Sequence, residues 1–158
     1  LVQNIFITSR RALGSQYQAI YNMEEDFAFE VAPARTFCFL SEVEMLKERG
    51  LIKGGGLENA VVIIDRPIDS IEIERLKNLF GIERNIIQGA NGILNGKVLR
   101  FKNEPVRHKT LDLIGDLALL GFPIKGHVTA AKAGHASNVE FVKKLKEQYY
   151  NELIELKS

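Results

Sequence analysis

Three ionisable residues, His108, Asp112 and Asp116, follow one another at intervals of four in an otherwise apolar segment. Each residue of an α-helix advances about 100° around the axis, so this interval places the side chains roughly one turn apart on one side. Side chains lean the same way along a helix, and a His and an Asp at this interval can therefore both reach one metal ion. The spacing predicts part of a metal site.

The same spacing also occurs on solvated helix faces, where it has no chemical role. Two features favour a metal-binding or catalytic role for these side chains. Asp116 extends the polar stripe by one turn inside a leucine-rich segment that we expect to be largely buried, and buried carboxylates need partners. A second Gly-His pair, Gly134-His135, follows a strand-like run. The alternative is a non-catalytic α+β interaction domain in which these side chains form only an internal hydrogen-bond network.

The composition is typical of a globular chain with a core of its own. Of the 158 residues, 46% are hydrophobic and 26% are charged. The formal net charge of +1 gives no electrostatic reason to expect nucleic acid or an anionic membrane as a partner. The one cysteine, Cys38, excludes an internal disulfide and is typical of a reducing compartment. No apolar run approaches a membrane span, so we expect no transmembrane segment.

Hydrophobic patterning predicts an α+β fold. The predicted strands cover residues 2–8, 16–21, 35–39, 59–65 and 124–131, and the predicted helices cover 24–30, 41–50, 70–80, 104–121 and 136–155. We predict a two-layer sandwich in which a mostly antiparallel sheet carries the two long helices, 104–121 and 136–155, on one face. Strand–helix alternation predicts a small β-α-β insertion at about 35–90.

Short sequence patterns predict where two helices begin and where two turns lie. Ser41, with Glu44 three residues later, predicts a capping box at the start of the second helix. Ser137 or Asn138 could cap the last helix. Asn91-Gly92 and Asn95-Gly96 predict hairpin-like turns around Ile93-Leu94 and residues 98–101.

Two familiar motifs are missing from the sequence. Gly54-Gly55-Gly56 precedes a strand, but no Lys-Ser or Lys-Thr follows it, so a phosphate-binding P-loop is excluded and a tight turn is favoured. The sequence contains no His-Glu-x-x-His, so a metallopeptidase of that type lacks support.

Several short motifs stand together in a consistent order. They are Ala34-Arg35-Thr36-Phe37, Gly50-Leu51, residues 54–60, Leu99-Arg100-Phe101, residues 106–109, Leu111-Asp112, Ile114-Gly115-Asp116, Gly121, Ala131-Lys132 and Gly134-His135-Ala136. This set resembles the family of zinc-dependent UDP-3-O-acyl-N-acetylglucosamine deacetylases, LpxC, of lipid A biosynthesis. The match runs from about residue 34 to 138. It implies that residues 1–158 form the second, C-terminal domain of such an enzyme, with the first domain absent.

The resemblance implies roles for individual residues. His108 and Asp112 would be two zinc ligands, and Asp116 and His135 would be an electrostatic and acid–base pair. The hydroxyl of Thr36 would help to hold the developing oxyanion.

The resemblance also implies the substrate and the reaction. Lys109 and Phe37 would bind the substrate, and residues 54–60 would help to form an apolar passage for its acyl chain. The enzyme would be a cytoplasmic bacterial hydrolase that uses Zn²⁺ to remove acetate from UDP-3-O-acyl-N-acetylglucosamine.

One part of the family's pattern is not in this sequence. The family's third zinc-binding His and its catalytic Glu are adjacent in the first half, and this chain contains no Glu-His pair. We interpret the third histidine, His127, as a core or surface residue. A catalytic zinc site usually has three protein ligands, so we expect these residues alone to be inactive and to bind zinc weakly.

The start of the chain points the same way. It begins at Leu1, directly in a strand-like run, so we expect it to be part of a longer protein. The missing half would pack against the two long helices, which predicts an exposed apolar patch on this chain.

Overall fold

The structure is a computed structural model that describes residues 2–9, 17–22, 27–54, 56, 59–81, 86, 89–124 and 126–155. The described residues fall into two compact units. The first unit contains residues 2–9, 17–34 and 103–155, and the second contains residues 35–102 with their gaps.

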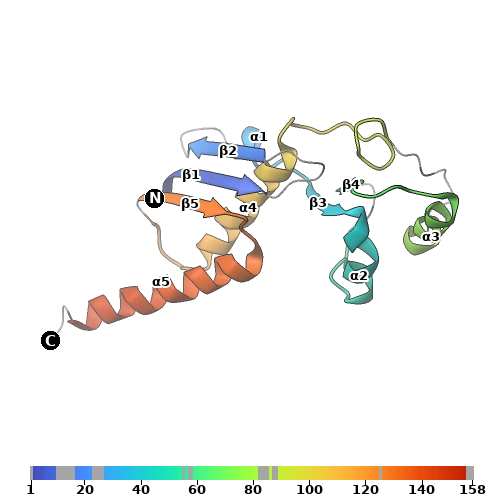
Figure 1. The fold of residues 1–158 in the computed structure, drawn as a ribbon. Helices are drawn as coiled ribbons and strands as arrows, with labels where there is room; N and C mark the ends of the chain where they lie inside the picture. Colours follow the sequence, from blue (N-terminus) through green and yellow to red (C-terminus); the bar gives the residue numbers. More distant parts are fainter. Residues whose placement is uncertain are drawn as a thin grey trace. The chain divides into compact units, whose positions relative to one another are not determined.

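A three-stranded sheet forms one layer of the first unit (Figure 1). Its strands are β1 (Val2–Ser9), β2 (Tyr17–Asn22) and β5 (Gly126–Ala131), in the order β2-β1-β5. β1 pairs antiparallel with β2 but parallel with β5. The predicted α+β class is confirmed, whereas a mostly antiparallel sheet does not hold for the described strands. The reason is the helical crossover that precedes β5, since such a connection can return the chain in the parallel direction.

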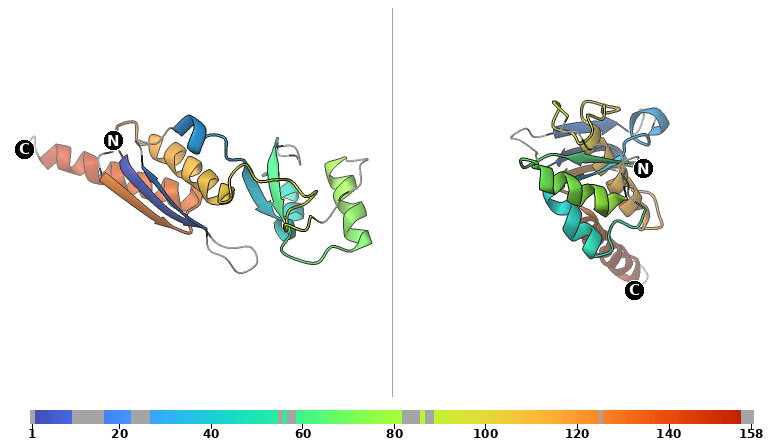
Figure 2. Two further views of the ribbon diagram at one scale, coloured as in Figure 1. Left: turned by 90° about the horizontal axis from the view of Figure 1, so that it is seen from above. Right: turned by 90° about the vertical axis from the view of Figure 1, so that its right-hand side faces the viewer.

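Two long helices, α4 (Glu104–Ala118) and α5 (His135–Glu155), cover one face of this sheet (Figure 2). The short helix α1 (Phe27–Glu30) precedes them in the chain. Pro105 lies in the first turn of α4, where its missing N–H costs no hydrogen bond. Along β5, Val128 and Ala130 pack against the core, whereas His127 and Thr129 are exposed on the other face. His127 is therefore a surface residue.

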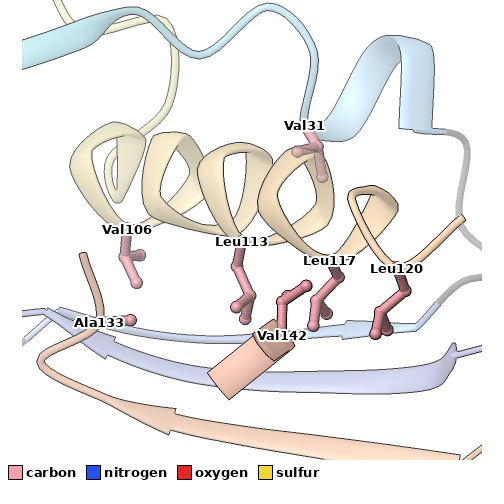
Figure 3. Close-up of a cluster of buried hydrophobic side chains, with 7 residues drawn as sticks. All are labelled: Val31, Val106, Leu113, Leu117, Leu120, Ala133 and Val142. Carbon is pink, nitrogen blue, oxygen red and sulfur yellow. The ribbon is translucent and has the colours of Figure 1, made fainter. Parts of the chain in front are cut away.

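The core of the first unit lies between the helices and the strands (Figure 3). Val106, Leu113 and Leu117 of α4, together with Leu120 just after it, are almost fully buried, and Val142 of α5 joins them. Burying such a side chain contributes roughly 1.5–3 kcal/mol. Because this apolar stripe faces the sheet, His108, Asp112 and Asp116 lie on another side of the helix.

The second unit contains a parallel β-α-β element, as predicted. β3 (Thr36–Phe39) pairs with β4 (Ala60–Ile63), and the 3₁₀ turn η1 (Leu40–Glu42) and helix α2 (Val43–Glu48) lie between them in the chain. Helix α3 (Ser70–Phe80) follows, with the predicted bounds. Its Asp69 cap accepts a hydrogen bond from the Glu72 N–H at 2.8 Å.

The segment between the two predicted Asn-Gly turns lies beside β4. Leu94 N donates to Val62 O at 3.0 Å, and Ile63 and Ile93 form an antiparallel bridge. Asn95 and Gly96 both have positive φ, at 60° and 58°, as a tight hairpin turn requires. Residues 98–101 do not form a strand.

The capping box predicted at Ser41 is wrong. Ser41 lies inside η1, and its hydroxyl and its backbone N–H both donate to the carboxylate of Asp65, 24 residues away. The backbone N–H of Ser41, which a capping box would have paired with the side chain of Glu44, is paired with Asp65 instead. In the described part of the chain, no helix is long and apolar enough to cross a membrane.

Candidate metal and acid–base site

His108 and Asp112 lie side by side on α4, one turn apart. The Nε2 atom of His108 is 3.4 Å from Oδ1 of Asp112, and the two side chains are 17% and 25% exposed. Two ligands of a tetrahedral zinc ion, each about 2.0–2.2 Å from the metal, lie roughly 3.4 Å apart. The pair therefore fits two neighbouring corners of a zinc site.

The tautomer of His108 also suits a metal ligand. Its Nδ1 lies 3.1 Å from the carbonyl oxygen of Ala34. A carbonyl only accepts, so Nδ1 carries a hydrogen, and Nε2 is the ring nitrogen that faces Asp112. Metal-binding histidines usually donate their other ring N–H in this way. Arg107 secures the segment that ends at Ala34, because its Nη1 donates to both the carbonyl and the carboxylate of Glu30 at 2.6 Å.

Asp116, one turn beyond Asp112, binds the imidazole of His135. The His135 Nδ1–H donates to Oδ2 and Oδ1 of Asp116 at 2.9 and 3.1 Å. The His135 Nε2 is then left free to give or take a proton, and it lies 3.8 Å from Oδ1 of Asp112. The four residues predicted as metal ligands and acid–base pair are thus brought together in one cluster.

The start of α5 positions His135. Gly134 occupies the N-cap position, since its N–H donates to Ser137 Oγ and its carbonyl accepts from the backbone N–H of Asn138. The helix therefore begins at His135, and neither Ser137 nor Asn138 caps it. The Asn138 side chain has a different role, which no local pattern predicts: its Nδ2 donates to Asp116 Oδ2 at 2.9 Å.

Lys109 lies next to this cluster. Its Nζ donates to the carbonyl oxygen of Ala133 at 2.8 Å, in the loop between β5 and α5. The preceding residue, Lys132, has a φ of 54°, which is unusual for a residue other than glycine. Lys109 therefore supports the loop that leads to His135, and its predicted contact with substrate stays a prediction.

Thr36 and Phe37 belong to the second unit, where they lie on β3. Both line a cavity of about 390 Å³. The other lining residues are mostly apolar and come from β3, β4, α2, α3 and the glycine turn: Cys38, Leu46, Leu51, Ile52, Lys53, Gly54, Gly56, Ala60, Val62 and Phe80. A cavity of this size and lining is typical of a site for an apolar ligand.

Two features shape this cavity. The side chain of Asn59 bridges Gly54 and Gly56 of the cavity wall. It accepts a hydrogen bond from the N–H of Gly56 and donates one to the carbonyl of Gly54, both at 2.8 Å. Burial, together with the smaller effect of the negative charges of Glu42 and Asp65, raises the pKa of the Cys38 thiol from 9.0 to about 11. The thiol is therefore neutral and behaves as part of the apolar wall.

Within the described residues, no group of three or more His, Cys, Asp or Glu side chains could hold a metal ion. His108 and Asp112 therefore fit a metal as two of its ligands. Beside them lies the hydrogen-bonded pair of His135 and Asp116, so the cluster offers two candidate metal ligands and one candidate acid–base pair.

Comparison with known proteins identifies the family. The profile described as "LpxC: UDP-3-O-acyl N-acetylglycosamine deacetylase" matches residues 3–80 and 70–147. The chain is 52% identical over 136 residues to the bifunctional enzyme LpxC/FabZ of Chlorobaculum tepidum, covering 85% of this chain and 29% of that protein. It is 43% identical over 135 residues to the UDP-3-O-acyl-N-acetylglucosamine deacetylase of Chlamydia pneumoniae, covering 85% of this chain and 39% of that one. The chain therefore belongs to the LpxC deacetylase family, and it spans less than half the length of these relatives.

Proposed function

We propose that this chain is the second half of a zinc-dependent deacetylase of lipid A biosynthesis, which removes acetate from UDP-3-O-acyl-N-acetylglucosamine. The observation that carries the proposal is the cluster of His108, Asp112, Asp116 and His135, whose distances suit a metal-ligand pair beside an acid–base pair. The names of the relatives support the substrate and the reaction.

In this proposal His108 Nε2 and Asp112 Oδ1 hold the zinc ion. When bound, zinc would supply a Lewis acid for the amide carbonyl and would lower the pKa of a bound water to about 7. The third ligand and the carboxylate that takes the water's proton would come from the first half of the enzyme. The second half alone would then be inactive.

His135 acts as the general acid. Its Nε2 gives a proton to the nitrogen of the leaving amine, while its Nδ1–H stays on the carboxylate of Asp116. The negative charge of Asp116 stabilises the imidazolium before that transfer and fixes the orientation of the ring. The resemblance to the family would give the hydroxyl of Thr36 the role of donor to the oxyanion that develops on the carbonyl.

The second unit binds the acyl chain. Its cavity of about 390 Å³ is lined mainly by apolar side chains, which suits a hydrocarbon chain, and Phe37 forms part of the wall. Lys109 binds the polar part of the substrate. The bacterial cytoplasm is the proposed place of action, since a single cysteine suits a reducing compartment.

Exposed apolar side chains on the helices of the first unit support the proposal that the first half of the enzyme packs against them. Leu119, just after α4, is 55% exposed, and Phe141 and Tyr150 of α5 are 46% and 58% exposed. Apolar side chains left exposed on a helix are available for contact with a partner. We propose that the first half packs against these helices.

The test is zinc-dependent acetate release by the full-length polypeptide that carries this chain. Replacing a general acid costs about 10²- to 10⁴-fold in kcat, so His135→Ala should lower kcat by that factor. His127→Ala is the matched control, because His127 lies on the exposed face of β5, away from the cluster. If His108→Ala and His135→Ala both retain full activity, the cluster is only a hydrogen-bond network and the interaction-domain alternative is correct.

A further inference from the structure

We infer that Asn138 is a positioning residue of this site: its side-chain amide holds the carboxylate of Asp116 in the orientation that aims His135. The inference rests on the proposed function. Asn138 is 5% exposed, and its Nδ2 donates to Asp116 Oδ2 at 2.9 Å, the same oxygen that accepts the shorter bond from His135 Nδ1.

The orientation of this amide follows from its partner. A carboxylate oxygen accepts hydrogen bonds and cannot donate them, so the nitrogen of the amide, and not its oxygen, faces Asp116. The amide therefore adds a second donor to a carboxylate whose side chain is only 13% exposed. Two donors restrict rotation of the carboxylate plane more than one donor does.

Asn138 also links two helices at the point where the acid–base pair meets. Asp116 is on α4, whereas His135 and Asn138 are three residues apart on the first turn of α5. The backbone N–H of Asn138 donates to Gly134 O at 3.0 Å, which fixes that turn. The amide thus ties the carboxylate to the same helical turn that carries the imidazole.

The imidazole depends on this arrangement. The side chain of His135 is 69% exposed, so packing contributes little to its orientation. The hydrogen bond to Asp116 is what directs Nε2, and any rotation of the carboxylate would turn the ring. A residue that fixes Asp116 therefore acts on the rate of proton transfer rather than on substrate binding.

The expected effect follows from residues in similar positions. Outer partners of a catalytic or metal-binding side chain cost about 10- to 100-fold when removed. Asn138→Ala, which deletes the donor, should lower kcat by about that factor and leave KM within about twofold. Asn138→Asp keeps the shape but places a like charge beside Asp116, so its kcat should be lower still.

The experiment measures kcat and KM of the full-length enzyme in a double-mutant cycle. In an Asp116→Ala background, Asn138→Ala should cause no further loss, because a positioning residue acts only through the group it holds. Thr110→Val is the matched control: it deletes a buried hydroxyl bond to Val106 O on the same helix and should cost stability without lowering kcat.

Two results would overturn the inference. One is an Asn138→Ala enzyme whose kcat stays at the wild-type value. The other is an equal loss of kcat with and without Asp116, which would mean that Asn138 only stabilises the fold.

Absence of acetate release by the wild-type enzyme would instead refute the proposed function. The positioning contact is then tested by NMR of the same polypeptide. The side-chain amide resonances of Asn138 should shift on Asp116→Ala, and unchanged resonances would refute the contact.

Discussion

Filling the cavity of the second unit should shorten the acyl chain that the enzyme accepts. Ala60 of β4 lines this cavity, next to Asn59, whose side chain is hydrogen-bonded to Gly54 and Gly56. Ala60→Leu adds three carbon atoms to the wall. If the cavity holds the end of a hydrocarbon chain, the added side chain takes the place of about three methylene groups.

The magnitude follows from the free energy of burying those groups. Each buried methylene contributes roughly 0.8 kcal/mol, so three contribute about 2.4 kcal/mol. Since about 1.4 kcal/mol is a factor of ten, the variant should lose about 50-fold in kcat/KM for a long-chain substrate. A substrate whose acyl chain is too short to reach Ala60 should lose nothing.

The assay compares kcat/KM for UDP-N-acetylglucosamine substrates with a long and a short 3-O-acyl chain, in the full-length enzyme. Asn78→Leu is the control, because Asn78 is exposed on α3 and does not line the cavity. Thermal unfolding of both variants shows whether the fold is kept. An equal loss for long and short substrates, or no loss for either, would refute the assignment of the cavity to the acyl chain.

Two further predictions concern the second unit. The raised pKa of Cys38 means that its reactive thiolate is scarce below about pH 11: at pH 8 its thiolate fraction should be about 100-fold below that of a free thiol of pKa 9.0. Alkylation should therefore be slow at pH 8 and should reach the rate of an unfolded control only in denaturant; equal rates with and without denaturant would contradict the burial of the thiol. Gly89→Ala should lower the free energy of unfolding by about 1–3 kcal/mol or more, because an added Cβ would lie 2.5 Å from both Gly96 Cα and Ile93 O. Urea unfolding measures this, with Gly54→Ala as the control, since a Cβ there meets nothing within 4 Å; equal stability of the two variants would contradict the close approach at Gly89.

The helices could be predicted from the sequence because their signals are local. Apolar residues at three- and four-residue intervals predict the bounds of α3. Pro105 lies in the first turn of α4, and Gly121 follows its last turn. The parallel pairing of β1 with β5 could not be predicted in this way, because it joins segments more than 100 residues apart and depends on how the helices pack.

In the candidate site too, contacts between residues far apart in the sequence could not be predicted. The interval of four identified His108, Asp112 and Asp116 as neighbours, but it gave no information about which side chain binds His135. Asn138 fits a capping role by residue type, and nothing near it in the sequence indicates its bond to Asp116, 22 residues away. Ser41 likewise fits a cap by residue type, whereas its partner Asp65 lies 24 residues away in the chain. Long-range acceptors of this kind are visible only in the structure.

We propose that α4 supplies two zinc ligands to an active site that a first half completes. The zinc affinity of the full-length enzyme tests this, measured by competition with a chelator for the wild type, His108→Ala, Asp112→Ala and the surface control His127→Ala. We expect one bound zinc ion in the wild type and in the control. Both ligand variants should lose more than a hundredfold in affinity, beyond the roughly 10–100-fold that outer partners cost. Wild-type affinity in either His108→Ala or Asp112→Ala would contradict the claim.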